Sequence, residues 1–234
     1  MKLKKIDNVY DGYFKILEAT VETSKGEIIK REIFSRASKG NGDDGVAAIV
    51  YDIKKHKYIF TKQFRVGLYK SEDKYVTEAV AGTLKEGEDP KECMIREIEE
   101  ELGYSTENIL PLGEFYVSPG GSAEKIFLYE AYVSDKVSEG GGLAEEHEEI
   151  ETIEMTYAEM RDFVFNDAKT IVGVQKMIMK KNRNIYTILE EIGFEEKAKQ
   201  LKKGIENGVD PEQLLFSALQ DFYSNILSDK DNDV

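Results

Sequence analysis

The residues best suited to chemistry lie in a short acidic stretch near the middle of the chain. Between Arg96 and Glu101, four of the six residues are glutamates and one is an arginine. Like charges three or four residues apart on a helix repel one another. The stretch is therefore either a solvated acidic surface or a set of carboxylates that holds a positive ion.

A helix has to place these carboxylates on one side. Asp89 followed by Pro90 is typical of a helix start, with an aspartate N-cap and proline in the first helical position, and Gly103 is typical of a helix end. At 100° per residue, the apolar residues form one face that should pack on a sheet, and Glu99 points away from the other carboxylates. Three carboxylates converge on a separate face: Glu97, Glu100 and Glu101.

The overall charge narrows the ligands that the chain can bind. The 234 residues carry a formal net charge of −14, with 41% hydrophobic and 33% charged residues. This composition fits a soluble globular protein of one or two domains. Nucleic-acid binding needs a basic surface, so no nucleic-acid partner is expected. A phosphate-bearing substrate would also be repelled unless cations intervene.

Histidine and cysteine are scarce. The chain has two histidines, His56 and His147, and a single Cys93, which excludes an internal disulfide framework and a cysteine-based zinc site. A metal site would therefore use oxygen ligands, which favours Mg²⁺ or Mn²⁺. No run of about 18 apolar residues predicts a membrane span, and the N-terminus lacks the apolar segment of a signal peptide. We expect a cytoplasmic protein without a membrane partner.

The regions around the acidic helix differ in pattern. Strands are predicted in the first 36 residues, where 13–22 and 27–36 carry β-branched and aromatic residues. The small polar segment 37–45 indicates a linker. The apolar segment that follows predicts a buried strand, and further strands flank the acidic helix.

Apolar residues at helical spacing predict helices at 167–180, 185–208 and 210–227. We accordingly expect an N-terminal β-domain, a central α/β domain and a helical C-terminal extension, at 1–44, 45–184 and 185–234.

The spacing of the acidic stretch resembles the signature of the Nudix hydrolase family. That signature is a glycine, five residues, a glutamate, seven residues, then Arg-Glu-apolar-x-Glu-Glu-x-Gly-apolar. Every fixed position matches, and the last apolar place is a softer departure because it is more often aliphatic. In this chain the signature consists of Gly82, Glu88, the run Arg96–Gly103 and Tyr104.

Further segments, between about residues 8 and 182, resemble the ADP-ribose and nucleotide-sugar pyrophosphatases of that family. The triple glycine resembles the GDP-mannose hydrolases and the UDP-glucose pyrophosphatases in particular. These segments are "KQFRVGLY", "TEAVAGTLKEGE", "YVSPGGSAEKIFLYEA" and "GGGLAEEHEEIE". The resemblance implies an α/β fold: a Nudix α/β/α sandwich with a mixed sheet, preceded by a small antiparallel β-domain. It also implies a homodimer that exchanges this β-domain. The helical C-terminal extension lies outside the resemblance.

The resemblance implies metal-dependent hydrolysis of the pyrophosphate in a nucleoside diphosphate sugar, to a nucleoside monophosphate and a sugar phosphate. Mg²⁺ or Mn²⁺ would polarise the phosphoryl oxygens and lower the pKa of an attacking water. Glu97 and Glu101 are the expected direct ligands, with Glu100 acting through water. The carbonyl of Ala81 is a further ligand, and Arg96 is expected to orient a carboxylate.

The general base is expected on the acidic loop near residue 146. The resemblance places it on Glu146 and an additional metal contact on Glu148. His147 ranks below Glu146 as a base, and an exposed acidic loop without a catalytic role is the alternative. The register could differ by one residue, since four glutamates are candidates: Glu145, Glu146, Glu148 and Glu149.

Four residues are expected to contact the substrate. Arg65 is the choice for a phosphate because a guanidinium matches phosphate geometry. Glu78 and Glu124 occupy positions that are substrate- or metal-adjacent in the similar enzymes, and Arg31 would reach a nucleotide from the N-terminal domain. The alternative function is a Nudix-fold module that senses a nucleotide sugar without cleaving it.

Overall fold

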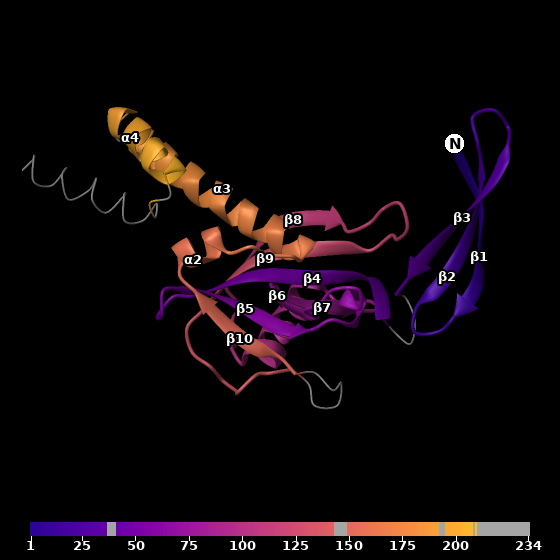
Figure 1. The fold of residues 1–234 in the computed structure, drawn as a ribbon, viewed down its shortest axis with the longest axis horizontal. Helices are drawn as coiled ribbons and strands as arrows, with labels where there is room; N and C mark the ends of the chain where they lie inside the picture. The colour runs from indigo at the N-terminus through magenta and orange to yellow at the C-terminus, as the bar shows by residue number, and fades with distance from the viewer. Residues whose placement is uncertain (37–40, 143–148, 192–194, 208, 210–234) are drawn as a thin grey trace, which may run out of the picture. The chain divides into compact units, whose positions relative to one another are not determined.

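The N-terminal region is a small antiparallel sheet. The structure is a computed structural model that describes the chain except residues 37–40, 143–148, 192–194, 208 and 210–234. Strand β1 (Lys2–Asp11) pairs with β2 (Lys15–Glu22), which pairs with β3 (Ile28–Ser35), and the order is β1-β2-β3. The predicted N-terminal strands are confirmed (Figure 1).

The second sheet is mixed and carries the site. Its main path is β10-β5-β4-β9-β8, with β6 paired to β5 and β7 paired to β4. Strand β9 is parallel to β4, whereas β5 and β7 are antiparallel to it. The bounds are β4 Asn41–Asp52, β5 Lys57–Phe64, β6 Tyr75–Glu78, β7 Val80–Lys85, β8 Ile109–Tyr116, β9 Lys125–Val133 and β10 Glu151–Met155.

One part of the predicted linker is wrong. Strand β4 begins at Asn41, so the second half of segment 37–45 lies in the sheet rather than in a connection. Side chains hold it there, because Asp43 accepts a hydrogen bond from the amide of Arg36 (2.7 Å) and Asp44 accepts one from the amide of Lys125 (3.1 Å).

The acidic helix starts at the predicted cap and ends at Gly103 as predicted, but its last turn is not α-helical. Helix α1 (Pro90–Glu97) is capped by Asp89, whose side chain accepts hydrogen bonds from the amides of Lys91 and Glu92. The chain then continues into η2 (Ile98–Leu102), a π-helical turn that ends at Gly103 with φ of 78°. Turns of this kind are wider than an α-helix and are frequent at functional sites.

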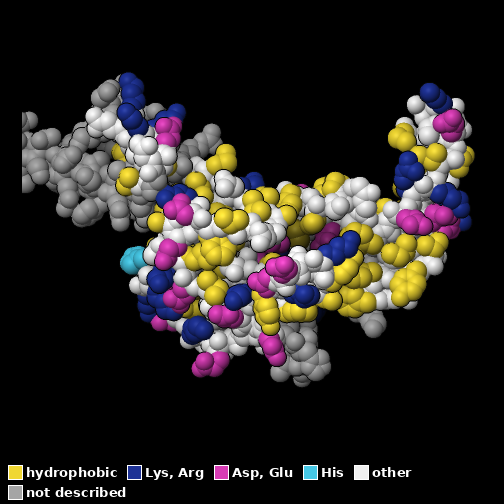
Figure 2. Space-filling view, viewed as in Figure 1, with side chains coloured by type: hydrophobic (Ala, Val, Ile, Leu, Met, Phe, Trp, Pro, Cys, Tyr) yellow, Lys and Arg dark blue, Asp and Glu magenta, His cyan; other side chains and the backbone are white. Residues whose placement is uncertain are grey.

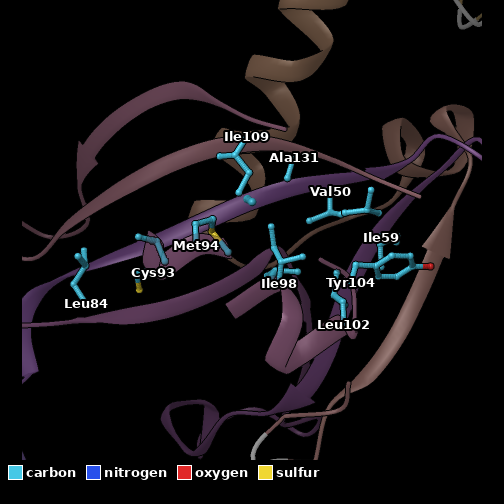
Figure 3. Close-up of a cluster of buried hydrophobic side chains, with 14 residues drawn as sticks. Val50, Ile59, Leu84, Cys93, Met94, Ile98, Leu102, Tyr104, Ile109 and Ala131 are labelled. Carbon is cyan, nitrogen blue, oxygen red and sulfur yellow. The ribbon is translucent and has the colours of Figure 1, made fainter. Parts of the chain in front are cut away.

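Both faces of the mixed sheet are covered, as in a Nudix sandwich. On one face, α1 and η2 bury apolar side chains against β4, β7 and β9, among them Met94, Ile98 and Leu102, none of which is exposed (Figure 3). On the other face, Val172 packs with Leu128, and the rings of Phe60 and Phe165 lie 4.9 Å apart. Each buried side chain of this size contributes about 1.5–3 kcal/mol. The predicted α/β fold with a mixed sheet is confirmed.

The remaining helices are η1 (Val66–Leu68), α2 (Tyr157–Asp162), α3 (Ala168–Glu191) and α4 (Glu195–Glu206). By its contacts the chain forms two compact units, Met1–Glu154 with Val164–Gly173, and Met155–Phe163 with Val174–Val234. In the second unit Met160 and Val174 are buried. The helix predicted at 210–227 lies outside the described residues. In the part of the chain that the structure describes, no helix is both long and apolar enough to cross a membrane.

Candidate active site

The acidic helix and the loop before it meet at Arg96. Its Nε donates to Oε1 of Glu88 (3.1 Å), and its Nη1 donates to Oε1 of Glu97 and to Oε2 of Glu100 (2.8 Å each). We call Glu88, Arg96, Glu97 and Glu100 the Arg96 cluster. Burial alone lowers the pKa of the Arg96 guanidinium, but the three carboxylates outweigh it and raise the pKa. Three carboxylates share one cation, so the cluster retains a surplus of negative charge.

Gly82 makes room for one of these carboxylates. A Cβ at Gly82 would lie 2.0 Å from Cδ of Glu97 and 2.1 Å from its Oε1. The Glu97 carboxyl group therefore rests directly on the backbone of β7, next to Ala81, which pairs with Ala47 of β4. Two predicted metal ligands, Glu97 and the Ala81 backbone, thus come from adjoining segments.

Among the predicted carboxylate ligands that the structure describes, Glu101 is the most buried. It is 3% exposed, and it lies near enough to Arg65 for its charge to raise the pKa of that guanidinium. The three converging carboxylates therefore divide their neighbours: Glu97 and Glu100 face Arg96, and Glu101 is close to Arg65.

A second group of charges surrounds Glu78, which is 1% exposed. Its Oε1 accepts a hydrogen bond from Nε of Arg65 (2.7 Å), and its Oε2 accepts one from Nζ of Lys169. Lys169 also lies 3.0 Å from Oδ1 of Asp167. We call Arg65, Glu78, Asp167 and Lys169 the Glu78 cluster. Two cations here flank one buried carboxylate.

Lys169 was missed by the sequence analysis. It lies in the first turn of α3, 91 residues after Glu78. Next to it, the Thr170 hydroxyl accepts a hydrogen bond from the amide of Ala79 (2.7 Å), which ties this turn to the strand end that carries Glu78. No local pattern marks Lys169, because its partner is brought to it only by the fold.

The triple glycine caps the acidic helix. The amide of Gly141 donates to the carbonyl of Glu101 (2.8 Å), and the amide of Gly142 donates to the carbonyl of Glu100 (3.0 Å). Carbonyls in the last turn of a helix lack partners within the helix. A Cβ at Gly140 would lie 2.5 Å from the carbonyl carbon of Leu102, so this approach requires glycine. The chain therefore leaves Gly142 beside the turn that carries Glu100 and Glu101.

The other predicted residues lie apart from the two clusters or outside the described residues. Glu124 forms an ion pair with Arg36 (3.3 Å), and Arg31 is exposed on β3, where its Nη1 donates to the carbonyl of Lys30 (3.1 Å). Candidates on the acidic loop lie outside the described residues: Glu145, Glu146, His147 and Glu148.

A cavity of about 710 Å³ adjoins the Arg96 cluster. It lies between α1, η2 and the segment Ser138–Gly142, and its lining includes Arg96, Glu99 and Glu100. Glu99 was expected to point away from the site, yet it shares this cavity wall with two residues of the cluster. Its exposed carboxylate remains separate from the contacts of Arg96 that define the cluster.

Among the described residues, no three Asp, Glu, His or Cys side chains are arranged to hold a metal ion. The carboxylates of Glu97 and Glu100 instead both accept hydrogen bonds from one nitrogen of Arg96. Their chemistry nevertheless fits a hard divalent cation, since both are carboxylates and both lie within 2.8 Å of one point of positive charge.

Comparison with known proteins agrees with this geometry. The chain matches the NUDIX domain family over residues 43–172. It is 35% identical over 179 residues to a GDP-mannose pyrophosphatase of Cronobacter sakazakii, covering 71% of this chain and 89% of the relative. It is 33% identical over 179 residues to a methanol dehydrogenase activator of Bacillus methanolicus, covering 74% of this chain and 90% of that relative.

A solved structure shares the fold. The crystal structure of an ADP compounds hydrolase superposes with a TM-score of 0.61 at 19% identity, covering 82% of this chain and 96% of the other. The family match spans both clusters, including the capped acidic helix that carries most of the Arg96 cluster. The chain therefore belongs to the Nudix family.

Proposed function

We propose that this protein hydrolyses the pyrophosphate bond of a nucleoside diphosphate sugar, releasing a nucleoside monophosphate and a sugar phosphate. The observation that carries the proposal is the presence of two clusters of different composition, one with three carboxylates around Arg96 and one with two cations around Glu78. Such a substrate presents a diphosphate, whose negative charge would be neutralised by both positively charged side chains and a divalent metal ion. GDP-mannose is the first candidate because the Cronobacter sakazakii relative is a GDP-mannose pyrophosphatase, and ADP-ribose is the second.

Mg²⁺ or Mn²⁺ is the proposed cofactor. Glu97 and Glu101 would hold it directly, Glu100 through water, and the Ala81 carbonyl and Glu148 would complete the ligand set. When bound, the metal supplies charge neutralisation for the diphosphate and a lower pKa for an attacking water. Arg96 holds Glu97 and Glu100 in place from the side, and Gly82 leaves the space that the Glu97 carboxylate occupies.

The Glu78 cluster is proposed to bind the diphosphate. Arg65 is 44% exposed at its side chain, so its remaining N–H groups can reach a ligand while Nε stays on Glu78. Glu78 holds Arg65 and Lys169 close together, because its carboxylate offsets the repulsion between their two positive charges. Two further substrate contacts are proposed. They are Glu124, which pairs with Arg36, and Arg31 on β3.

The general base is proposed on the acidic loop, at Glu146. The described chain supports this placement through Gly142, which is bonded to the Glu100 carbonyl immediately before the loop begins. The general base must lie within reach of the water that it deprotonates. Because the loop begins beside the helix that carries the proposed metal ligands, a base on it would start close to the proposed metal site.

A homodimer is proposed as the working form. The N-terminal sheet and the turn between β1 and β2 expose large apolar side chains, including Tyr10, Tyr13 and Phe14. Figure 2 shows hydrophobic side chains on the surface of this region. Exposed apolar patches of this kind favour a protein interface. The cytoplasm is the proposed compartment, because Cys93 is a free and buried thiol.

A substrate screen tests the activity. The purified protein is incubated with GDP-mannose, ADP-ribose or UDP-glucose and Mg²⁺ or Mn²⁺, and released nucleoside monophosphate is measured. We expect release that stops when the metal is chelated. If a nucleotide sugar raises the melting temperature but is never cleaved with either metal, the protein is a sensor and the proposal fails.

A further inference from the structure

Tyr104 occupies the last position of the Nudix signature, where an aliphatic residue is more usual. Its side chain is 2% exposed and belongs to the core that packs α1 on the sheet. In Figure 3 the ring lies at one end of this core, close to Ile59 and Leu102, and its hydroxyl points out of the apolar cluster. The ring accounts for the packing in this core, and the hydroxyl needs a separate explanation.

The hydroxyl is fixed by a buried carboxylate. It donates a hydrogen bond to Oδ2 of Asp52 (3.0 Å), a residue at the end of β4 that is fully buried. Oδ1 of Asp52 accepts hydrogen bonds from the amides of Lys54 (2.9 Å) and Lys55 (3.0 Å). The carboxylate is thus held in place by the turn, and bonds to charged acceptors are stronger than neutral ones.

Lys55 adds a second tie. Its Nζ lies 3.3 Å from the Tyr104 hydroxyl and 2.5 Å from Oε1 of Glu154 on β10. The end of the acidic helix is therefore attached through one hydroxyl to the turn after β4 and, through Lys55, to β10.

The backbone of Tyr104 lies in the cap of the acidic helix. It forms an isolated bridge with Lys136. The next two amides, of Val137 and Ser138, donate to the carbonyl of Gly103 (2.7 and 3.2 Å). Gly141 and Gly142 then cap the carbonyls of Glu101 and Glu100, as described above. Tyr104 consequently joins the capping segment at the point where it meets the helix.

We propose that Tyr104 is a positioning residue, whose hydroxyl fixes the setting of η2 and hence of the carboxylates of Glu100 and Glu101. This role rests on the proposed metal site. The π-helical turn has a wider ring of hydrogen bonds than an α-helix, so contacts from outside have to define its orientation. Displacements of about 1 Å in a catalytic group can cost about 100-fold in rate, which makes a directional bond at this point valuable.

Tyr104→Phe tests the proposal because it removes only the hydroxyl. We expect kcat to fall about tenfold with KM for the nucleotide sugar within about twofold. Mn²⁺ affinity, measured by electron paramagnetic resonance without substrate, should weaken several-fold. Tyr51→Phe is the matched control: its hydroxyl lies 3.3 Å from Nδ1 of His56 in the same hairpin, and it should leave kcat and Mn²⁺ affinity unchanged.

The two possible failures are distinguishable. If Tyr104→Phe lowers only the melting temperature and keeps wild-type kcat and Mn²⁺ affinity, Tyr104 is a core residue and the inference is wrong. If the wild-type protein cleaves no nucleotide sugar, the proposed substrate is wrong, and the Mn²⁺ measurement still decides the role of Tyr104. An equal loss in Tyr51→Phe would also overturn the inference, because the effect would then belong to the hairpin as a whole.

Discussion

The Arg96 cluster and the Glu78 cluster combine the same kinds of side chain in different proportions. In the first, three carboxylates surround one guanidinium. In the second, one carboxylate holds an arginine and a lysine, and Asp167 touches only the lysine. The Arg96 cluster therefore has a surplus of negative charge, whereas carboxylates and cations are equal in number in the Glu78 cluster, where the Arg65 side chain is 44% exposed. On this difference we base the proposal that the Arg96 cluster binds metal and that the Glu78 cluster binds phosphate.

The two clusters also differ in what holds them. The Arg96 cluster lies within 13 residues of chain, from Glu88 to Glu100, on one helix and the loop before it. The Glu78 cluster combines the residue that follows β5, the end of β6 and the start of α3. Changes to the first should alter metal binding and kcat, and changes to the second should alter substrate binding.

Glu97→Gln should have the largest effect. The amide keeps the size of the side chain but removes the charge that a divalent cation requires, so we expect kcat to fall by about 100- to 1,000-fold. The melting temperature should stay close to wild type. The measurement is steady-state hydrolysis together with Mn²⁺ titration, and Glu101→Gln should behave in the same way.

The control for Glu97→Gln is Glu99→Gln, which changes the same chemistry on the same helix. Glu99 is exposed and lines the adjoining cavity, so its loss should change kcat less than about threefold. Equal losses in both variants would mean that total negative charge matters, and the Arg96 cluster would then not be a specific site.

Gly82→Ala should have the next largest effect. The new Cβ would lie 2.0 Å from Cδ of Glu97, and the carboxyl end of that flexible side chain has to move aside. We expect kcat to fall by about 100-fold, with little loss of stability. A crystal structure of the variant should show Glu97 displaced from Arg96. Wild-type kcat in a folded variant would contradict the position assigned to Glu97.

The Arg96 cluster was largely predictable from sequence, and the Glu78 cluster was not. Helical periodicity and the signature spacing place Glu97, Glu100 and Arg96 together, because all three lie within two turns of one helix. The cap at Asp89 was predictable for the same local reason. The α-helical period of 100° per residue does not predict the π-helical turn at Ile98–Leu102, because such a turn has a different period.

The Glu78 cluster depends on contacts that no local pattern records. Arg65 and Glu78 were expected separately, as substrate neighbours, without their mutual ion pair. Lys169 was not expected at all, because α3 and β6 are brought together by the fold of the whole domain. The linker was misassigned for a similar reason, since Asp43 and Asp44 are held by amides of Arg36 and Lys125.

Lys169→Met should mainly weaken substrate binding. It removes one of the two cations that we assign to the diphosphate, and we expect KM to rise about tenfold with a smaller change in kcat. Mn²⁺ affinity should be unchanged, which separates this variant from Glu97→Gln. Lys169→Arg keeps the positive charge, so its KM should lie between those of the wild type and Lys169→Met. A loss of Mn²⁺ affinity in Lys169→Met would remove the division between the clusters.

Glu88→Gln should have the smallest effect and the clearest pH dependence. Burial raises the pKa of Glu88, but hydrogen bonds from Arg96 and from the Lys85 amide outweigh it and lower the pKa below its ordinary value of 4.5. A lowered folded-state pKa means that the carboxylate stabilises the protein above pH 4.5 and that this contribution disappears as the pH falls through the folded-state value. We expect Glu88→Gln to lower the free energy of unfolding by about 1 kcal/mol at neutral pH and to converge with wild type in acid.

The matched control is Glu86→Gln, an exposed glutamate in the same loop, which should follow the wild-type curve at every pH. Urea unfolding between pH 3 and 7 measures both variants. A constant offset between Glu88→Gln and wild type across this range would show that Glu88 acts by packing alone. Glu97 and Glu100 would then be sufficient to hold Arg96, and the Glu88 carboxylate would have no electrostatic role in the Arg96 cluster.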